Sequence, residues 1–83
     1  MDVEKSLDLG KGHKIEIGKS TWDSTRTSIR NRYPTATGGF SPRSSSEIPI
    51  EDIKPLAIAA IKSGKLTNAD IIEIMKSGLE NLK

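Results

Sequence analysis

The side chains best suited to chemistry in this chain lie within residues 26–46. All four arginines of the protein occur there: Arg26, Arg30, Arg32 and Arg43. A guanidinium group is a planar fork of hydrogen-bond donors that fits a phosphate or a carboxylate. No Asp or Glu interrupts this segment. We therefore expect a negatively charged ligand to bind here rather than elsewhere on the chain.

The same segment carries side chains that could complete such a site. The rings of Tyr33 and Phe40 could stack on a base, and serine hydroxyls could donate hydrogen bonds to phosphate oxygens. The predicted ligand-binding set consists of Arg26, Arg30, Arg32, Tyr33, Phe40, Arg43, Ser44, Ser45 and Ser46.

Residues that would support catalysis are scarce. His13 is the only histidine, and no nearby pattern of serine and carboxylate is typical of a catalytic triad. Glu47, Glu51 and Asp52 form a local carboxylate group, which we interpret as charges at the start of a helix rather than as metal ligands. The chain has no cysteine for a thiolate zinc site. We therefore expect no enzyme, no metal site and no cofactor.

Charge is unevenly distributed in a protein whose formal net charge is only +2. Residues 9–46 contain seven Lys or Arg against two Asp or Glu, whereas the segments on either side carry a small negative balance. This distribution favours a local anion site over a broadly basic surface. No apolar run approaches the roughly 18–20 residues that span a membrane. The N-terminus lacks the apolar region of a signal peptide, so we expect a small soluble, cytoplasmic protein.

Two elements are predicted in the first part of the chain. Residues 6–18 alternate between apolar and polar side chains on both sides of Gly10–Gly12, which predicts a β-hairpin. Residues 20–33 are predicted as a polar helix, because the segment starts with a capping-like Ser20–Asp23 and ends before Pro34. In that helix Arg26 and Arg30 would share one side.

The second part of the chain is predicted as a loop followed by two helices. Residues 34–46 are rich in Pro, Gly, Ser and Thr, and we interpret them as a loop that is either ordered by ligand or a flexible connector. Residues 50–83 repeat apolar side chains at helical spacing, with a cap at Thr67, and predict a helical hairpin. The stripe that includes Ile71, Met75 and Leu79 is expected to be its core.

Together these elements predict an α+β fold in one small domain over residues 1–83, with a mostly α fold as the alternative. A chain of 83 residues buries a limited core, and small domains without disulfides commonly gain core by oligomerising. We therefore expect a homo-oligomer.

Three functions are compatible with the arginine-rich segment. The first is a non-catalytic binding protein that captures a nucleotide or a small cyclic or linear oligonucleotide, acting as a sensor or a sequestering antagonist of nucleotide signalling. The second is a small DNA- or RNA-binding regulator that uses the same arginines on a polymer. Steep loss of affinity with salt would distinguish the polymer ligand. The third is a protein–protein inhibitor or adaptor whose Arg/Ser segment folds on an acidic partner.

Overall fold

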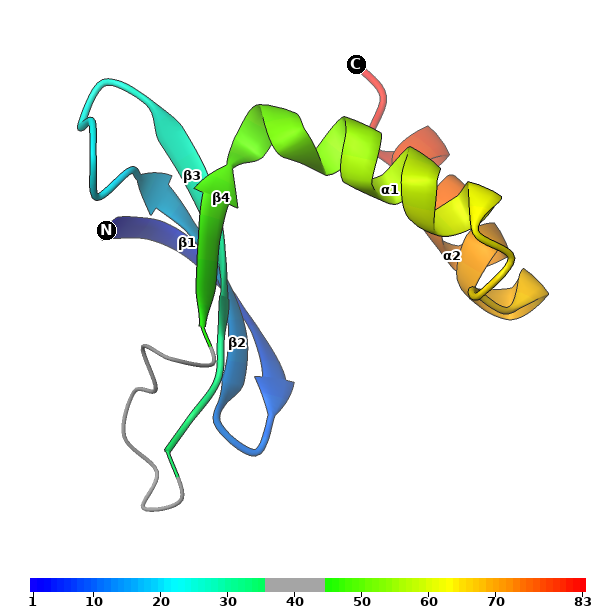
Figure 1. Ribbon diagram of the computed structural model, residues 1–83, viewed down its shortest axis with the longest axis horizontal. Helices are drawn as coiled ribbons and strands as arrows, with labels where there is room; N and C mark the ends of the chain where they lie inside the picture. The colour runs from blue at the N-terminus through cyan, green and yellow to red at the C-terminus, as the bar shows by residue number, and fades with distance from the viewer. Residues whose placement is uncertain (36–44) are drawn as a thin grey trace. The chain divides into compact units, whose positions relative to one another are not determined.

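The computed structural model describes residues 1–35 and 45–83 of the chain. These residues form two compact units, Met1–Asp52 and Ile53–Lys83. The first contains a four-stranded antiparallel sheet and the second a pair of helices (Figure 1). This confirms the α+β class, while the single domain over 1–83 stays a prediction. The elements are β1 Asp2–Gly10, β2 His13–Lys19, β3 Thr27–Arg32, β4 Ser46–Pro49, the 3-10 turn η1 Ile50–Asp52, α1 Ile53–Lys62 and α2 Asn68–Glu80.

The predicted hairpin of residues 6–18 is confirmed as the pairing of β1 with β2. Its turn needs left-handed backbone at three successive residues, with φ of 91° at Gly10, 54° at Lys11 and 81° at Gly12. Glycine adopts such angles without the steric cost that a Cβ atom brings. The Asp8 carboxylate accepts a hydrogen bond from the Gly10 amide at 2.8 Å, which fixes the entry to the turn.

Another glycine is required where the backbone of β1 lies very close to that of β2. A Cβ atom added at Gly18 would lie 2.0 Å from the carbonyl oxygen of Asp2 and 2.9 Å from the amide nitrogen of Glu4. The register of β1 shifts at this place, between Val3 and Lys5. The close approach of the two backbones therefore depends on the missing side chain of Gly18.

The predicted helix over residues 20–33 is wrong. Residues 27–32 form β3, which pairs with β2 on one side and with β4 on the other. The preceding residues make a loop in which Asp23 accepts from the Thr25 amide at 2.9 Å, and the Ser20 amide donates to the Arg26 carbonyl at 3.0 Å. Asp23 therefore stabilises a turn rather than a helix start, as short polar side chains commonly do. Two ladders of backbone hydrogen bonds outweigh the weak helix propensity of this Ser/Thr-rich segment.

Strand alternation separates the side chains of the sheet into two faces. We call one the polar face, which carries Lys14, Glu16, Ser28, Arg30, Arg32 and Glu47, and the other the apolar face, which carries Leu7, Ile15, Ile17, Ile29, Asn31 and Ile48. Ser28 and Glu16 are almost fully buried, although both are polar. Their polar atoms are hydrogen-bonded, Ser28 to the Ser20 hydroxyl and Glu16 to Arg30 and Arg32.

The predicted loop over residues 34–46 is too long at its C-terminal end, because Ser46 already belongs to β4. Residues 36–44 of that segment lie outside the described residues. At the N-terminal end, Pro34 packs close to the hairpin turn, since a Cβ atom added at Gly12 would lie 3.0 Å from the Pro34 Cβ. The segment thus leaves the sheet beside the turn that joins β1 to β2.

The predicted helical hairpin of residues 50–83 is confirmed by α1 and α2, which follow η1. The Thr67 hydroxyl caps α2 by accepting a hydrogen bond from the Asp70 amide at 3.1 Å. Gly64 has a φ of 74° and ends the first helix in the left-handed conformation typical of a helix C-terminus. These local signals are strong in sequence because each concerns residues that are at most four positions apart.

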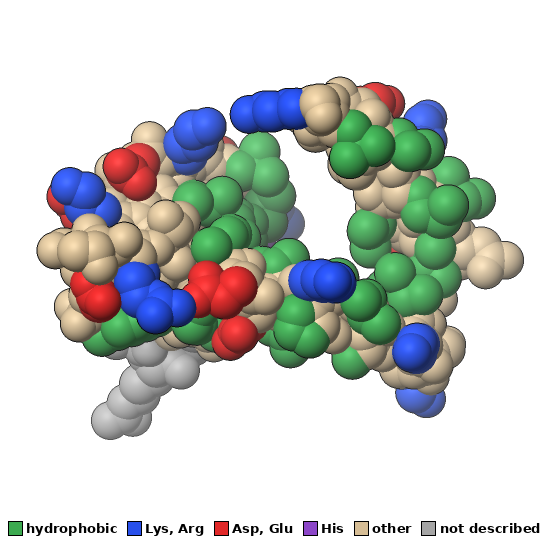
Figure 2. All heavy atoms as spheres, turned by 90° about the horizontal axis from the view of Figure 1, so that it is seen from above, with side chains coloured by type: hydrophobic (Ala, Val, Ile, Leu, Met, Phe, Trp, Pro, Cys, Tyr) green, Lys and Arg blue, Asp and Glu red, His purple; other side chains and the backbone are tan. Residues whose placement is uncertain are grey.

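Among residues 1–35 and 45–83, no hydrophobic side chain is fully buried. Apolar side chains are visible at the surface of both units (Figure 2). The expectation that Met75 and Leu79 form the core of the helical hairpin is wrong, since they are 58% and 68% exposed, while Ile71 is half-buried. Each unit thus presents an apolar surface that its own side chains leave uncovered.

Candidate functional site

The polar face brings two of the predicted arginines together around one carboxylate. Arg30 Nε and Nη2 donate to Glu16 Oε1 at 3.0 and 2.7 Å. Arg32 Nη1 donates to Glu16 Oε2 at 3.1 Å. The arrangement follows from the strand period, because residues 30 and 32 point to the same side of β3 and Arg30 pairs with Glu16 across the β2–β3 ladder. We call these three residues the arginine cluster.

The arginine cluster is rigid because its carboxylate is nearly buried. The side chain of Glu16 is 6% exposed, that of Arg30 15% and that of Arg32 34%. Burial raises the pKa of the Glu16 carboxyl, but hydrogen bonds from Arg30 and Arg32 outweigh this effect, and the pKa lies below its ordinary value. Glu16 is therefore charged at neutral pH and holds both guanidinium groups in place.

The surroundings of the cluster carry further charges of both signs. Lys14 lies directly opposite Arg32 in the β2–β3 register, and Glu47 lies opposite Arg30 in the β3–β4 register. The Glu47 carboxylate accepts from the Thr21 amide at 2.8 Å and from the Thr21 hydroxyl at 2.7 Å. Asp8 in turn lies opposite Lys14 in the β1–β2 register, so three cationic side chains meet three carboxylates around the cluster, and Arg32 and Lys14 lie at the same end of the group.

Tyr33 belongs to a separate group on the apolar face. Its ring stacks on that of His13, with a centroid distance of 4.4 Å and an interplanar angle of 10°. Asn31 connects the polar ends of both rings, with 2.5 Å between its Oδ1 and His13 Nε2 and 3.2 Å between its Nδ2 and the Tyr33 hydroxyl. We call His13, Asn31 and Tyr33 the ring cluster.

The two clusters lie on opposite faces of the sheet. Asn31 pairs with Ile15 across the ladder, whereas its neighbours Arg30 and Arg32 project to the other side. The sequence interpretation placed these residues on a helix, where such a clear division does not arise. A strand interpretation of residues 27–32 would have revealed both the shared side of Arg30 and Arg32 and the opposite side of Asn31.

Arg26 lies apart from the arginine cluster. It precedes β3 at the end opposite Arg32, and its Nη2 donates to Glu51 Oε1 at 2.5 Å. Both partners are more than half exposed, so this is a surface ion pair, a type that contributes little to stability. The structure therefore pairs Arg26 with a carboxylate outside the arginine cluster.

The serines of the predicted set are only partly described. Ser45 accepts a hydrogen bond from the Tyr33 amide at 2.9 Å, and Ser46 pairs with Asn31 at the start of β4. Both thus lie near the ring cluster. Phe40, Arg43 and Ser44 lie outside the described residues. Sequence reasoning missed Lys14, Glu16, His13 and Asn31 as members of the two clusters, because their proximity depends on strand pairing.

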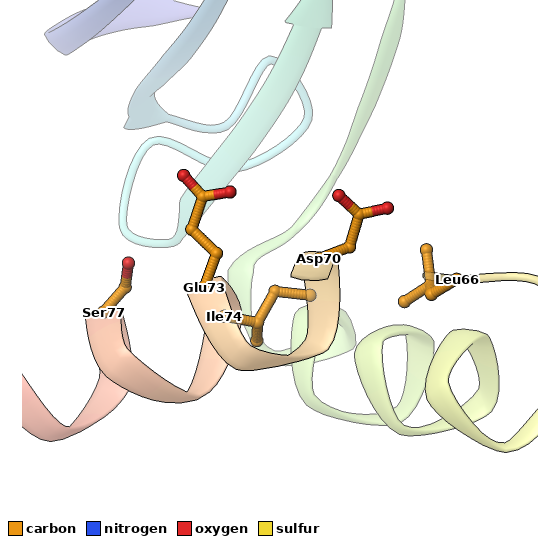
Figure 3. Close-up of a pocket in the computed structure, with 5 residues that line it drawn as sticks. All are labelled: Leu66, Asp70, Glu73, Ile74 and Ser77. Carbon is orange, nitrogen blue, oxygen red and sulfur yellow. The ribbon is translucent and has the colours of Figure 1, made fainter. Parts of the chain in front are cut away.

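A hollow of about 500 Å³ lies along α2. It is lined by Leu66, Asp70, Glu73, Ile74 and Ser77, and Figure 3 shows the carboxylates of Asp70 and Glu73 projecting to the same side of the helix. Two carboxylates would repel a phosphate group, so this hollow does not fit the predicted ligand.

The described residues were also compared with the requirements of a metal site and of a membrane-spanning helix. Within residues 1–35 and 45–83, no group of three or more His, Cys, Asp or Glu side chains has the proximity that metal binding needs. No helix in the described part of the chain is long and apolar enough to cross a membrane.

The chain matches no protein-family model, no curated protein and no solved structure. The geometry of the two clusters is therefore the basis for assigning a function.

Proposed function

We propose that the protein is a non-catalytic binding protein for a phosphate-bearing ligand, either a nucleotide or a small linear or cyclic oligonucleotide. The observation that supports this proposal is the arginine cluster, in which Glu16 holds Arg30 and Arg32 on one face of β3. Guanidinium groups are the side chains best matched to phosphate oxygens. A protein that binds such a ligand without converting it would act as an intracellular sensor or as a sequestering agent for nucleotide signals, and we place it in the cytoplasm.

Preorganisation is the main physical argument for this site. An arginine side chain has roughly 2 kcal/mol of rotamer entropy, which a ligand must offset when it immobilises the chain. Here Glu16 has already fixed both guanidinium groups before a ligand arrives. Glu16 neutralises one of the two guanidinium charges and Glu47 lies opposite Arg30, while the charge of Lys14 beside Arg32 is balanced by Asp8, its partner in the β1–β2 register. The cluster therefore offers a ligand ordered guanidinium donors rather than an excess of positive charge.

A DNA- or RNA-binding regulator is the second candidate, and the spacing of the arginines favours it. Arg30 and Arg32 are two positions apart on β3, which corresponds to about 6.6 Å along the strand. A row of cations along an extended strand could follow the backbone of a single-stranded nucleic acid. The affinity for a polymer should then fall steeply as salt rises, because bound counterions are released from it. A mononucleotide should show a much weaker salt dependence.

The experiment that tests the proposal compares two arginines of equal charge. Calorimetric titration of nucleotides and short oligonucleotides should detect a ligand for the wild type. Arg32→Ala should weaken its binding about tenfold to a hundredfold, since a charge-assisted hydrogen bond contributes about 1.5–3 kcal/mol. Arg32→Lys should recover part of this loss, because lysine keeps the charge but not the fork.

Arg26→Ala is the matched control. It removes the same charge from the exposed pair with Glu51, at the other end of β3, and should leave the affinity nearly unchanged. Equal losses in Arg26→Ala and Arg32→Ala would indicate a general charge effect. Failure of every anionic ligand to bind the wild type would contradict the proposal.

We further propose that the protein is a homo-oligomer, and α2 offers the surface that supports this. Ile72, Met75, Leu79 and Leu82 follow one another at spacings of three, four and three residues and are 56–75% exposed. This spacing is typical of the seam between paired helices. A second copy of the chain could cover such a seam, which water contacts in the isolated unit.

A further inference from the structure

The ring cluster is not explained by the arginine cluster, because it lies on the opposite face of the sheet. His13 comes from the start of β2, and Tyr33 comes directly after β3. Asn31 binds the polar ends of both rings, and it thereby fixes their near-parallel orientation. The two rings thus form an ordered stack beside the hairpin turn, in which each ring covers one face of the other and the outer faces remain for a ligand.

The position of the ring cluster leaves it accessible. Tyr33 is 38% exposed, and His13 is half-buried. The Tyr33 amide donates to Ser45 at 2.9 Å, so the ring stands where the chain leaves β3 and returns toward β4. An aromatic face held rigidly at the surface loses little conformational entropy when a flat ligand stacks on it.

We propose that the His13–Tyr33 ring pair is a stacking platform for a nucleobase of the ligand whose phosphate binds Arg30 and Arg32. This inference rests on the proposed function and specifies the ligand of that site. Each base stacked on an aromatic side chain contributes substantially to the binding of single strands and does so with little sequence preference. The amide of Asn31 is engaged with both rings, so the platform offers a face rather than hydrogen-bond readout of the base edge.

The separation of the clusters sets the size of the ligand. Arg32 and Tyr33 are neighbours in sequence but belong to clusters on opposite faces of the sheet. A ligand that reaches both must pass over the end of β3 beside Pro34. The base and phosphate of one nucleotide are joined through a single sugar, so two or more linked nucleotides suit a path from one face to the other better than one does. The ligand class is therefore an oligonucleotide rather than a mononucleotide.

The test separates base contacts from phosphate contacts with three probes. The first is a short oligothymidylate, the second an abasic deoxyribose-phosphate oligomer of the same length, and the third thymidine monophosphate. The wild type should bind the oligothymidylate roughly fivefold to a hundredfold tighter than the abasic oligomer, as expected for stacking of one base. Thymidine monophosphate should bind most weakly of the three.

Substitutions at the ring cluster should remove only the part of the binding affinity that depends on the base. Tyr33→Leu keeps an apolar side chain but has no ring face, and the affinity of this variant for the oligothymidylate should fall to its affinity for the abasic oligomer. Tyr33→Phe retains the ring but loses the hydrogen bond from Asn31, and should keep most of the preference for the oligothymidylate. Arg32→Ala should weaken binding of both oligomers by the same factor. Melting temperatures of all variants confirm that the sheet remains folded.

The outcomes distinguish the platform from the phosphate site. If the wild type binds both oligomers equally, or if Tyr33→Leu retains the preference for the oligothymidylate, the platform is excluded while the phosphate site stands. If thymidine monophosphate binds as tightly as the oligothymidylate, the ligand does not span both clusters and the inference fails. If neither oligomer nor the monophosphate binds, the proposed function fails and the platform falls with it.

Discussion

At the scale of single residues, Glu16 determines how the polar face is organised. Its carboxylate is the common acceptor for Arg30 and Arg32, and its own burial would be costly without them. Removing one partner of a buried ion pair leaves the charge of the other partner uncompensated. Substitutions in the arginine cluster therefore affect both the stability of the fold and ligand binding. Arg32 is the most exposed member and is thus the best position for testing binding alone.

Acid should weaken the fold through Glu16. Because its pKa in the folded protein lies below the ordinary value of 4.5, the folded state favours the charged form. The stabilisation from this group is fully present above about pH 4.5 and is lost as the pH falls through the lower folded-state value. The melting temperature of the wild type should therefore decrease on acidification by more than that of Glu16→Gln, which has no carboxyl group to titrate.

Comparison of the two proteins isolates Glu16 from other acidic groups. The pKa of Glu47 is also lowered: burial raises it, but hydrogen bonds from Thr21 and Ser28 outweigh that effect. Glu47 is present in both proteins, so its contribution cancels in the difference between their melting curves. If the melting temperatures of the wild type and of Glu16→Gln fall by the same amount between neutral and acidic pH, the cluster does not favour the charged form of Glu16.

At the scale of elements, sequence patterns predicted the structures that depend on neighbouring residues. The β1–β2 turn follows from two glycines between alternating strands, and the start of α2 follows from the Thr67 cap. The segment 20–33 was misinterpreted because β3 is formed by pairing with β4, which lies beyond the 34–45 segment. Such non-local pairing leaves little trace in the local sequence, and the same pairing creates both clusters.

Two glycines provide a direct test of the sheet geometry. Gly18→Ala should lower the free energy of unfolding by about 1–3 kcal/mol, the range for overpacking, because its Cβ would meet the Asp2 carbonyl at 2.0 Å. Gly78→Ala is the control, since nothing lies within 4 Å of its added Cβ in α2. It should stabilise the protein by about 0.4–1 kcal/mol. Urea unfolding measures both, and equal effects of the two substitutions would contradict the β1–β2 register.

At the scale of the whole molecule, the scarcity of buried apolar side chains is the main feature. No hydrophobic side chain in residues 1–35 and 45–83 is fully buried, although burial of apolar surface is the dominant favourable term in folding. The length and composition of the chain predicted a small hydrophobic core, but they could not indicate which apolar side chains remain exposed to solvent. The exposed seam of α2 identifies one such set.

The seam predicts an oligomer that a single charge should disrupt. Sedimentation of the wild type at micromolar concentration should show a dimer or a larger symmetric assembly. Leu79→Lys places a charge within the seam, where Leu79 is 68% exposed, and should shift the protein toward the monomer. Ser77→Lys adds the same charge on another side of α2 and should leave the assembly intact. A monomeric wild type at high concentration would exclude this interface.

The most direct test of the account is to observe the guanidinium groups during ligand binding. The Nε–H signals of Arg26, Arg30 and Arg32 can be followed by nuclear magnetic resonance while a short oligonucleotide is added. The Arg30 and Arg32 signals should shift with a common saturation curve, because both belong to the arginine cluster. The Arg26 signal, from the exposed pair with Glu51, should remain in place. Saturable binding that leaves the Arg30 and Arg32 signals unchanged would contradict the account.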